Sequence, residues 1–513
     1  MSRKNGGIIG PANTPVGGLF KGVAGGVWRM NDVVNFVGNS QWPSTPKSID
    51  NSCRFNSGSS DFLSGTFSNS GNRRTFTISF WIKRASIGSD ERIIEADTGT
   101  NGNNVNGIEF DTISSSNRLR VIFYNDPSVN LNLKTNELFS DLSAWYHIVL
   151  AIDTTQSTSS DRAKLYVNGS QITSFETATY PSQNYDADWN VSGNNIRIGR
   201  RIDSSPEYLN AYLAETVFID GQALTASSFG ETDSTTGIWK PKKIGSFSSA
   251  GDNSFYLDFK DSSNLGNDAS GLNNDLTVNN LTSIDQSTDT CVVNYATINP
   301  LNTFPSTPPT ISEGNLQCRT INADPGYFGG SGTIGVSTGK WYFEVKPTVS
   351  TSGTPFLIGV SHDPAEAARQ GTTASAQYSA SEYVYYGHNG NKGNSGSYTS
   401  YGNSYAVNDI IGVALDLDNH KIYFSKNGTF QNSGVPTSGS TGTGSAFDLT
   451  TGETYFPFLS DGGGSVCTYQ LNFGSPPYSI SSGNSDANGH GNFEYAVPSG
   501  YYALNTSNLN TYG

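Results

Sequence analysis

Two acidic residues, Glu109 and Asp111 in the run GIEFDT, have the spacing that comes nearest to catalytic chemistry. Side chains of a strand alternate between its two faces, so both carboxylates would lie on one face. Two facing carboxylates about 5–5.5 Å apart hydrolyse glycosidic bonds with retention of configuration. One such pair among 44 acids is, however, close to chance. We therefore expect no enzyme, and a polysaccharide depolymerase using these two acids is the alternative.

The histidines do not add to the case for catalysis, because all five are scattered along the sequence. His147 lies in the run YHIVLAID, which is typical of a buried strand, so we predict a core histidine rather than a base. The chain contains no GxSxG or HExxH motif. No residue is therefore predicted to be catalytic.

The segment Phe255–Thr282 is rich in Asp and Asn and suggests either a calcium site or a series of turns. Ca²⁺ prefers oxygen ligands, and the candidates are Asp258, Asp261, Asp268 and Asp275. Counted from Asp261, the twelfth loop position is Leu272, where an EF-hand has Glu. Asp and Asn also form turns through their own side chains. We expect turns, with bound Ca²⁺ as the alternative and no other cofactor.

The composition predicts that β-sheets position these residues. Charged residues make up 14% of the 513 residues, against about 25% in typical soluble domains. Aromatic residues reach 12%, and 57 glycines supply turns. Strand and turn formers outnumber helix formers. We predict an all-β fold with two antiparallel, jelly-roll-like β-sandwich domains in tandem, preceded by a short N-terminal anchoring arm.

The charge and hydropathy of the chain exclude several classes of partner. A net charge of −14 argues against binding to nucleic acid, which requires clustered Lys and Arg. No window reaches the roughly 18 apolar residues of a membrane span. The N-terminus lacks the apolar region of a secretory signal, so we expect synthesis in a cytoplasm without export by that route. A homo-oligomer is compatible with the sequence.

Two stretches about 265 residues apart share one β-hairpin pattern. In Ile410–Gly428 an apolar run, a polar turn and an alternating strand lead to the dipeptide Asn427-Gly428. The stretch Trp145–Gly169 repeats this order with a longer polar insertion. We therefore predict two sandwich domains built on the same plan.

Residues 46–287 contain the runs FTISFWIK, WYHIVLAID, KLYVNG, IRIGRR and YLAETVFIDGQALT. Together these runs resemble the laminin G-like, concanavalin A-like jelly roll, which implies an antiparallel two-sheet sandwich. Enzymes of that fold carry acid-x-acid-x-x-acid on one strand, whereas Ser114 stands at the third position here. Sugar binding by ring stacking and hydrogen bonds would use loop residues. Our candidates are Asp186, Trp189, Asn190 and Tyr208.

Residues 310–513 follow a Pro-rich connector, residues 288–309, and contain GKWYFEV, IGVALDLDNHKIYFSKNG, YFPFLS and LNFG. This order of motifs resembles a SPRY domain. The resemblance implies a bent β-sandwich that binds partners through loops at one end, without enzymatic activity. Loops rich in Tyr, Ser, Gly and Asn suit adaptable binding. The candidate binding residues are Tyr383, Tyr385, Tyr398, Tyr401 and Tyr405.

Residues 1–45 differ from the rest and include GIIGPANTP and GVWRMNDVVNFVGNSQWP. Apolar residues near helical spacing predict a short helix that cannot bury itself, so it must dock on the chain's own sandwich or on a partner. The segment resembles the N-terminus of structural proteins of tailed phages that infect marine bacteria, which implies docking to a virion. The predicted docking residues are Trp28, Met30, Val33, Val34, Val37 and Trp42.

These features lead us to expect a non-enzymatic structural protein of a phage virion, either of tail or fibre type or decorating the capsid. It would be assembled in the host cytoplasm and exposed on the particle surface. Its sandwiches would bind a host-surface glycan or protein, or neighbouring virion proteins, and many copies would make weak sites sufficient. The alternatives are the depolymerase and a purely structural cement protein.

Overall fold

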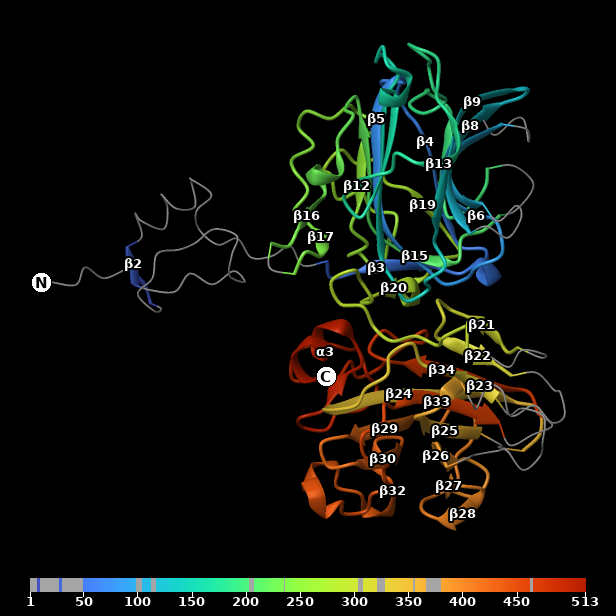
Figure 1. Cartoon of the computed structure of the whole chain (residues 1–513), viewed down its shortest axis with the longest axis vertical. Coiled ribbons are helices and arrows are strands. Elements are labelled where there is room, and N and C mark those ends of the chain that lie inside the picture. Colours follow the sequence, from blue (N-terminus) through green and yellow to red (C-terminus); the bar gives the residue numbers. More distant parts are fainter. Residues whose placement is uncertain are drawn as a thin grey trace, which may run out of the picture.

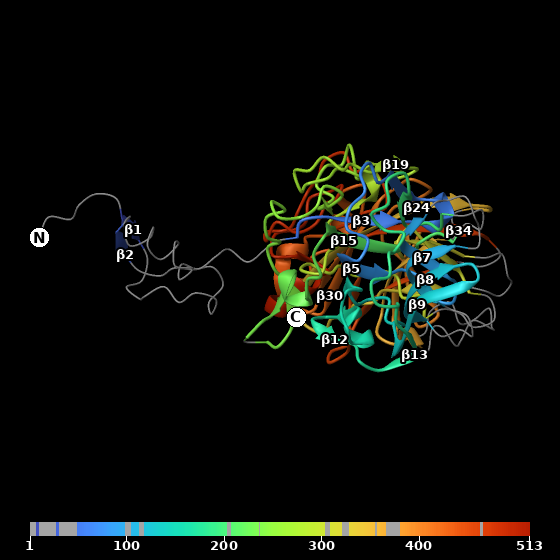
Figure 2. The same cartoon turned by 90° about the horizontal axis from the view of Figure 1, so that it is seen from above.

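The computed structural model describes residues 7–9, 27–29, 49–97, 104–111, 117–202, 207–234, 236–302, 308–320, 328–353, 356–365, 380–461 and 465–513. Two β-sandwiches lie end to end along the longest axis, with the first above the second in Figure 1. In the view along that axis the two bodies overlap (Figure 2). Nearly all regular structure is β, which confirms the predicted fold class.

The first sandwich consists of two eight-stranded sheets. One has the order β12-β11-β10-β5-β15-β3-β20, with β18 paired to β15. Its strands are β3 (Ser52–Phe55), β5 (Thr75–Arg84), β10 (Tyr146–Asp153), β11 (Ala163–Val167), β12 (Ser170–Gln171), β15 (Ala211–Asp220), β18 (Phe255–Leu257) and β20 (Gln286–Ser287). The other has the order β13-β9-β8-β7-β6-β14-β4-β19. Its strands are β4 (Phe62–Thr66), β6 (Glu91–Asp97), β7 (Val105–Asp111), β8 (Arg118–Asn125), β9 (Ser128–Leu138), β13 (Phe175–Thr179), β14 (Asn195–Ile198) and β19 (Thr277–Asn279).

The alternation along β5 explains how the first core forms. Phe76, Ile78 and Phe80 point to one face and are fully buried between the two sheets. The opposite face of this sheet is covered as well, by the segment that carries β16 (Gly230–Thr232) and β17 (Trp239–Pro241). This sheet is therefore buried on both faces, which accounts for the nearly continuous apolar runs of β10 and β15.

The second sandwich contains a nine-stranded and a six-stranded sheet. The larger has the order β21-β22-β34-β24-β29-β30-β31, with β32 on β30 and β35 parallel to β24. Its strands are β21 (Thr310–Ser312), β22 (Gln317–Arg319), β24 (Lys340–Ser350), β29 (Ile411–Asp416), β30 (Lys421–Lys426), β31 (Thr429–Phe430), β32 (Phe447–Asp448), β34 (Cys467–Asn472) and β35 (Tyr502–Ala503). The smaller contains β23 (Phe328–Ser331), β33 (Phe456–Asp461), β25 (Phe356–Ser361), β26 (Glu382–Tyr386), β27 (Asn391–Asn394) and β28 (Ser397–Ser400). The short helix α3 (Thr506–Tyr512) closes the chain.

Both predicted hairpins are present. Strand β10 pairs with β11, and β29 pairs with β30, in each case antiparallel. The longer insertion of the first hairpin contains a single 3-10 turn, Ser159–Asp161, whereas the second closes directly after Asp416. The shared plan of the two domains is therefore visible at the level of their central hairpins.

Little of the N-terminal arm is described. Strands β1 (Gly7–Ile9) and β2 (Val27–Arg29) pair with each other and form a two-stranded sheet of their own. Trp28 belongs to β2, while the predicted helix and the docking residues Met30, Val33, Val34, Val37 and Trp42 lie outside the described residues. In the described part of the chain, no helix has the length and apolar character needed to cross a membrane.

Candidate functional site

The structure places two of the four predicted sugar-binding residues of the first sandwich inside its core. Trp189 is fully buried and its ring lies 5.8 Å from that of Phe76. Asn190 is equally buried, and its amide donates to the Asp220 carboxylate at 3.0 Å. The prediction that Trp189 and Asn190 lie on an exposed loop is therefore wrong, because their segment folds inward to close the end of the sandwich.

The other two candidates, Asp186 and Tyr208, remain at the surface, but each contacts a neighbouring arginine. Asp186 is ion-paired with Arg74 at 2.8 Å, and hydrogen bonding from that guanidinium holds the pKa of Asp186 below its ordinary value. Tyr208 is half-buried, and its ring centre lies 5.3 Å from the Arg200 guanidinium. The four predicted residues thus do not assemble into one binding surface.

Four of the five tyrosines predicted as contact residues of the second sandwich are core residues: Tyr383, Tyr385, Tyr401 and Tyr405. Tyr405, for example, donates to the backbone oxygen of Tyr385 at 2.8 Å, and burial raises its pKa. The prediction of exposed contacts is wrong for these four, because Tyr383 and Tyr385 face inward from β26 and the segment after β28 packs Tyr401 and Tyr405 into the same core. Tyr398 alone is half-exposed and stacks on Tyr386 at 5.0 Å between ring centres.

The aspartates of the segment Phe255–Thr282 form turns, as the sequence predicted. Asp268 accepts four hydrogen bonds, two of them from Ser270, and its own backbone N–H donates to Asp275 at 2.7 Å. Asp261 accepts hydrogen bonds from the backbone N–H and the hydroxyl of Ser263. Asp258 accepts one from the backbone N–H of Lys260. Across the described ranges, no group of three or more His, Cys, Asp or Glu residues could hold a metal ion. The turn interpretation accounts for all four acids.

Glu109 and Asp111 do share one face of β7, as the alternation predicts, but basic residues neutralise both. Glu109 contacts Arg92 at 2.6 Å through one carboxylate oxygen and Arg120 at 3.2 Å through the other. Asp111 contacts Lys134 at 3.3 Å and Arg120 at 3.7 Å. Both carboxylates are nearly buried, with 8% and 4% of their side-chain surface exposed. They belong to a structural ion-pair network on the outer face of the sheet.

His147 is a core histidine, as predicted. One ring nitrogen lies 3.0 Å from the Ser79 hydroxyl, and the other accepts from the Trp239 indole at 3.0 Å. Burial lowers its pKa to about 3, so the ring stays neutral at physiological pH. The Ser79–His147 pair resembles a nucleophile and its base, yet both side chains are buried and out of reach of a substrate.

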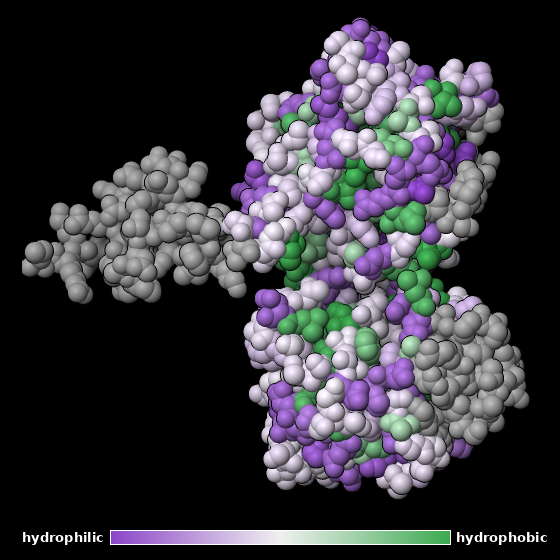
Figure 3. Space-filling view, viewed as in Figure 1, coloured by the Kyte–Doolittle hydropathy of each residue, from purple (hydrophilic) through white to green (hydrophobic). Residues whose placement is uncertain are grey.

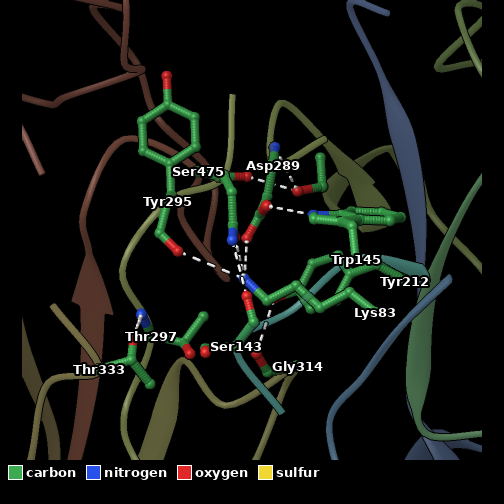
Figure 4. Close-up of polar contacts among 12 residues, drawn as sticks. Lys83, Ser143, Trp145, Tyr212, Asp289, Tyr295, Thr297, Gly314, Thr333 and Ser475 are labelled. Carbon is green, nitrogen blue, oxygen red and sulfur yellow. Dashed lines mark hydrogen bonds and ion pairs between the residues drawn. The ribbon is translucent and has the colours of Figure 1, made fainter. Parts of the chain in front are cut away.

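A polar cluster that joins distant parts of the chain lies between the two sandwiches (Figure 4). The Lys83 ammonium donates to the Asp289 carboxylate at 2.8 Å and to the Asn294 side-chain oxygen at 2.7 Å. It also donates to the backbone oxygen of Tyr295 at 3.3 Å, and the Trp145 indole donates to Asp289 at 3.2 Å. Lys83 and Asp289 are almost inaccessible, so this is a buried and hydrogen-bonded ion pair.

A second set of contacts runs beside the first. Arg54 on β3 lies 3.4 Å from Asp285 and 3.8 Å from Glu313, which belongs to the β21–β22 turn of the second sandwich. The Tyr212 hydroxyl on β15 donates to the backbone oxygen of Gly314 in the same turn at 2.8 Å. Arg54 and Tyr212 are fully buried. We call these contacts and those of Lys83 the junction, and it fixes the two sandwiches to one another.

The junction includes part of the segment predicted as a connector. Asp289 is buried against Lys83, whereas Tyr295, Ala296 and Ile298 pack in the second core. Sequence reasoning missed the junction because Lys83 alternates with apolar residues and therefore looks like a solvent-facing residue of β5. Only the fold brings Asp289, more than 200 positions later in the chain, within reach of its ammonium group.

Comparisons with known proteins agree with this architecture. Residues 56–229 match the concanavalin A-like lectin/glucanases superfamily, and residues 340–476 match the SPRY domain family. The chain therefore carries a concanavalin A-like domain followed by a SPRY domain, as the sequence predicted. No curated protein matches the chain.

Three of the similar solved structures each cover 34% of this chain. The SPRY domain of human HERC1 is 16% identical, is covered over 96% of its length and has a TM-score of 0.26. The TRIM65 PSpry domain is 13% identical, is covered over 91% and has a TM-score of 0.25. The stonustoxin structure is 18% identical, is covered over 27% and has a TM-score of 0.26.

Proposed function

We propose that this chain, a concanavalin A-like domain followed by a SPRY domain, is a non-enzymatic structural protein of a phage virion. It belongs to the tail or fibre, or it decorates the capsid, and it is exposed on the particle surface. Its two sandwiches bind a host-surface glycan or protein, or neighbouring virion proteins. Lectin-like and SPRY domains support a role in binding and protein interaction. The N-terminal resemblance to phage structural proteins supports the location.

The observation that carries the non-enzymatic proposal is the ion pairing of Glu109 and Asp111. A glycoside hydrolase needs one carboxyl group that donates a proton and a second that attacks the sugar or activates water. Here both oxygens of Glu109 contact guanidinium groups, and Asp111 contacts an ammonium and a guanidinium group. These carboxylates are engaged in holding strands β6 to β9 together and are not free to approach a substrate.

The junction supports a binding role on a surface. Because Lys83 and Arg54 fix the two sandwiches in one orientation, the binding faces of both domains keep a constant separation. Two sites held in this way can engage the same surface together, which raises the effective concentration of the second contact. Many copies on one particle would add further to this effect.

The test of the proposal is deletion of residues 1–45, followed by co-sedimentation with particles that lack the protein. We expect the full chain to sediment with the particles and the truncated chain to remain in solution. Thermal unfolding of the truncated chain should match that of the full chain, since every described residue of the two cores follows residue 45. Undiminished sedimentation of the truncated chain would rule out the N-terminal arm as the anchor.

Two further measurements separate the alternatives. A depolymerase would release sugars from host polysaccharide and would lose this activity in Glu109→Gln; we expect no release from either protein. A pure cement protein would stabilise particles without binding host cells, whereas we expect the purified full chain to bind them.

A further inference from the structure

A surface cavity of about 330 Å³ lies on the outer side of the β15 sheet, away from the junction. It is formed by the end of β15 and the segment that continues beyond β17, on the side where Figure 1 shows β16 and β17. Its apolar wall includes Leu224, Ile244 and Phe247, which belong to the small apolar cluster on this face of the sheet. This volume lies within the range of cavities that hold small ligands.

Two adjacent lysines, Lys242 and Lys243, line this cavity, and none of the described residues that line it is acidic. Lys242 donates only to the backbone oxygen of Ser227, at 3.2 Å, and neither lysine forms an ion pair within the described residues. The neighbouring Lys240, in contrast, pairs with two acids, Glu231 among them. A chain with a net charge of −14 thus keeps two cations unneutralised at the mouth of one cavity, which we call the lysine cavity.

Polar groups complete the lining. The side-chain nitrogen of Gln222 donates to the backbone oxygen of Ser249 at 2.8 Å. The side-chain oxygen of Gln222 has no partner in the part of the chain that is described. The hydroxyl groups of Ser228 and Ser246 also lie in the lining. The lysine cavity therefore combines cations, hydroxyl and amide groups, and an apolar wall.

We propose that the lysine cavity binds an acidic saccharide, with a sugar carboxylate at Lys242 and Lys243. The apolar wall fits the C–H face of a sugar ring, and the hydroxyl and amide groups fit its hydroxyls. A carboxylate with ammonium partners forms charge-assisted hydrogen bonds, which are the stronger kind. This inference rests on the proposed binding of host-surface glycans and specifies their chemical class. An acidic peptide would share the charge but not the ring, so the experiment includes one.

The experiment measures binding of oligogalacturonate to the full chain by isothermal titration calorimetry. Its fully methyl-esterified form, which has the same rings without the charges, is the matched ligand control. We expect the acid to bind and the ester to bind at least about tenfold more weakly, as loss of one charge-assisted hydrogen bond predicts. Added NaCl should weaken binding of the acid. Equal binding of acid and ester, or no binding of either, would overturn the proposal.

Variants locate the site. In the double variant Lys242→Gln/Lys243→Gln we expect at least about a tenfold loss of affinity, and Lys242→Arg/Lys243→Arg should retain binding because both charges remain. The matched control is Lys164→Gln/Lys260→Gln, which removes two exposed charges elsewhere on the same sandwich. Undiminished binding by the Lys242/Lys243 double variant would contradict the site. If polyglutamate binds as tightly and depends on the same lysines, the cavity recognises charge alone and the saccharide assignment is wrong.

Binding to host cells separates this inference from the function on which it rests. If the wild-type chain and the Lys242→Gln/Lys243→Gln variant bind cells equally, the lysine cavity is not the attachment site, while the proposed function stands. If the wild-type chain binds no cells but still binds oligogalacturonate, the cavity is correct and the proposed function fails.

Discussion

Asp61 lies close enough to the junction residues Arg54, Asp285 and Glu313 for their charges to influence its own. It is nearly inaccessible, and one of its carboxylate oxygens has no hydrogen-bond partner in the described structure. Burial raises its pKa to about 7, with further contributions from the negative charges of Asp285 and Glu313. Arg54 is the cation that these acids share, and it opposes the shift only in part. Asp61 therefore changes charge close to neutral pH.

The variant Asp61→Asn should reveal this titration. A carboxyl group whose pKa is raised in the folded state favours folding at low pH and loses that contribution as pH rises through about 7. We therefore expect the melting temperature of the variant, relative to wild type, to increase as pH is raised from about 5 to about 8. Asp261→Asn is the control, because hydrogen bonds from Ser263 hold the pKa of Asp261 below its ordinary value. A difference that does not vary with pH would show that Asp61 does not titrate in this range.

At the scale of single residues, the sequence predicted burial better than exposure. The neutral role of His147 followed from its apolar run, because a strand buried on both faces leaves no route to solvent. The binding residues failed because residue type alone does not say whether Trp189 or Tyr385 points outward from a loop or inward to close a core. Lys242 and Lys243 carried a usable signal, two adjacent cations in an acidic chain, but their cavity depends on the fold.

The two central hairpins end in the same local structure. Asn168 and Asn427 both have positive φ angles, of 47° each, and are followed by glycines with φ of 83° and 78°. In each case the Asn side-chain oxygen accepts, at 2.8 Å, from the backbone N–H of a residue at the start of the hairpin. In each case an aromatic ring packs directly over the glycine, Trp239 over Gly169 and Tyr495 over Gly428. The repeat thus extends from sequence pattern to turn geometry.

Substitution of these glycines by Ala should separate backbone strain from packing. A Cβ on Gly169 would lie 2.4 Å from the Trp239 ring, which is held in place by its hydrogen bond to His147. We expect Gly169→Ala to reduce the free energy of unfolding by about 2–5 kcal/mol, combining strain with overpacking. Gly428→Ala should reduce the free energy of unfolding by less than Gly169→Ala, because Tyr495 is half-exposed and can move. Chemical denaturation measures both.

Gly221→Ala is the matched control for this pair. Gly221 has a φ of 84°, and a Cβ there would meet nothing within 4 Å. Gly221→Ala should reduce the free energy of unfolding only by the strain contribution, about 1–2 kcal/mol. If Gly169→Ala is no worse than Gly221→Ala, the ring over the turn does not constrain the hairpin.

At the scale of elements, strands and hairpins followed from alternation and turn dipeptides, whereas sheet order did not. The run TFTISFWIKR predicted β5 correctly because its apolar residues recur at every second position. Nothing local indicates that β20, at the end of the first domain, pairs with β3 at its beginning. Such pairings join residues more than 200 positions apart and depend on global packing rather than on local propensity.

At the scale of the whole molecule, the junction makes the tandem one body. In the space-filling view, hydrophobic residues gather at the waist between the two sandwiches (Figure 3). The buried Lys83–Asp289 pair lies inside this waist, together with Arg54 and its acids. Burial raises the pKa of Asp289, and the positive charge of Lys83 opposes this rise. The two domains should therefore unfold together.

The variant Lys83→Met tests this coupling. Removing one partner of a buried ion pair leaves the other charge buried and uncompensated, which costs about 3–5 kcal/mol. We expect wild type to show one calorimetric transition and Lys83→Met to melt at lower temperature, with the two sandwiches unfolding separately. Adding Asp289→Asn to Lys83→Met should restore part of the lost stability, because the second substitution removes the unpaired charge.

Lys164→Met provides the control for loss of a lysine. Lys164 forms an exposed pair with Asp161 at 3.1 Å, and such pairs contribute no more than about 1 kcal/mol. The proposed coupling fails if Lys83→Met melts in one transition at the temperature of this control. If Lys83→Met splits the transition, the orientation of the two binding domains depends on one buried charge pair. Under the proposed function, a particle carrying that variant should then lose the avidity that a fixed separation provides, even though each sandwich keeps its own sites.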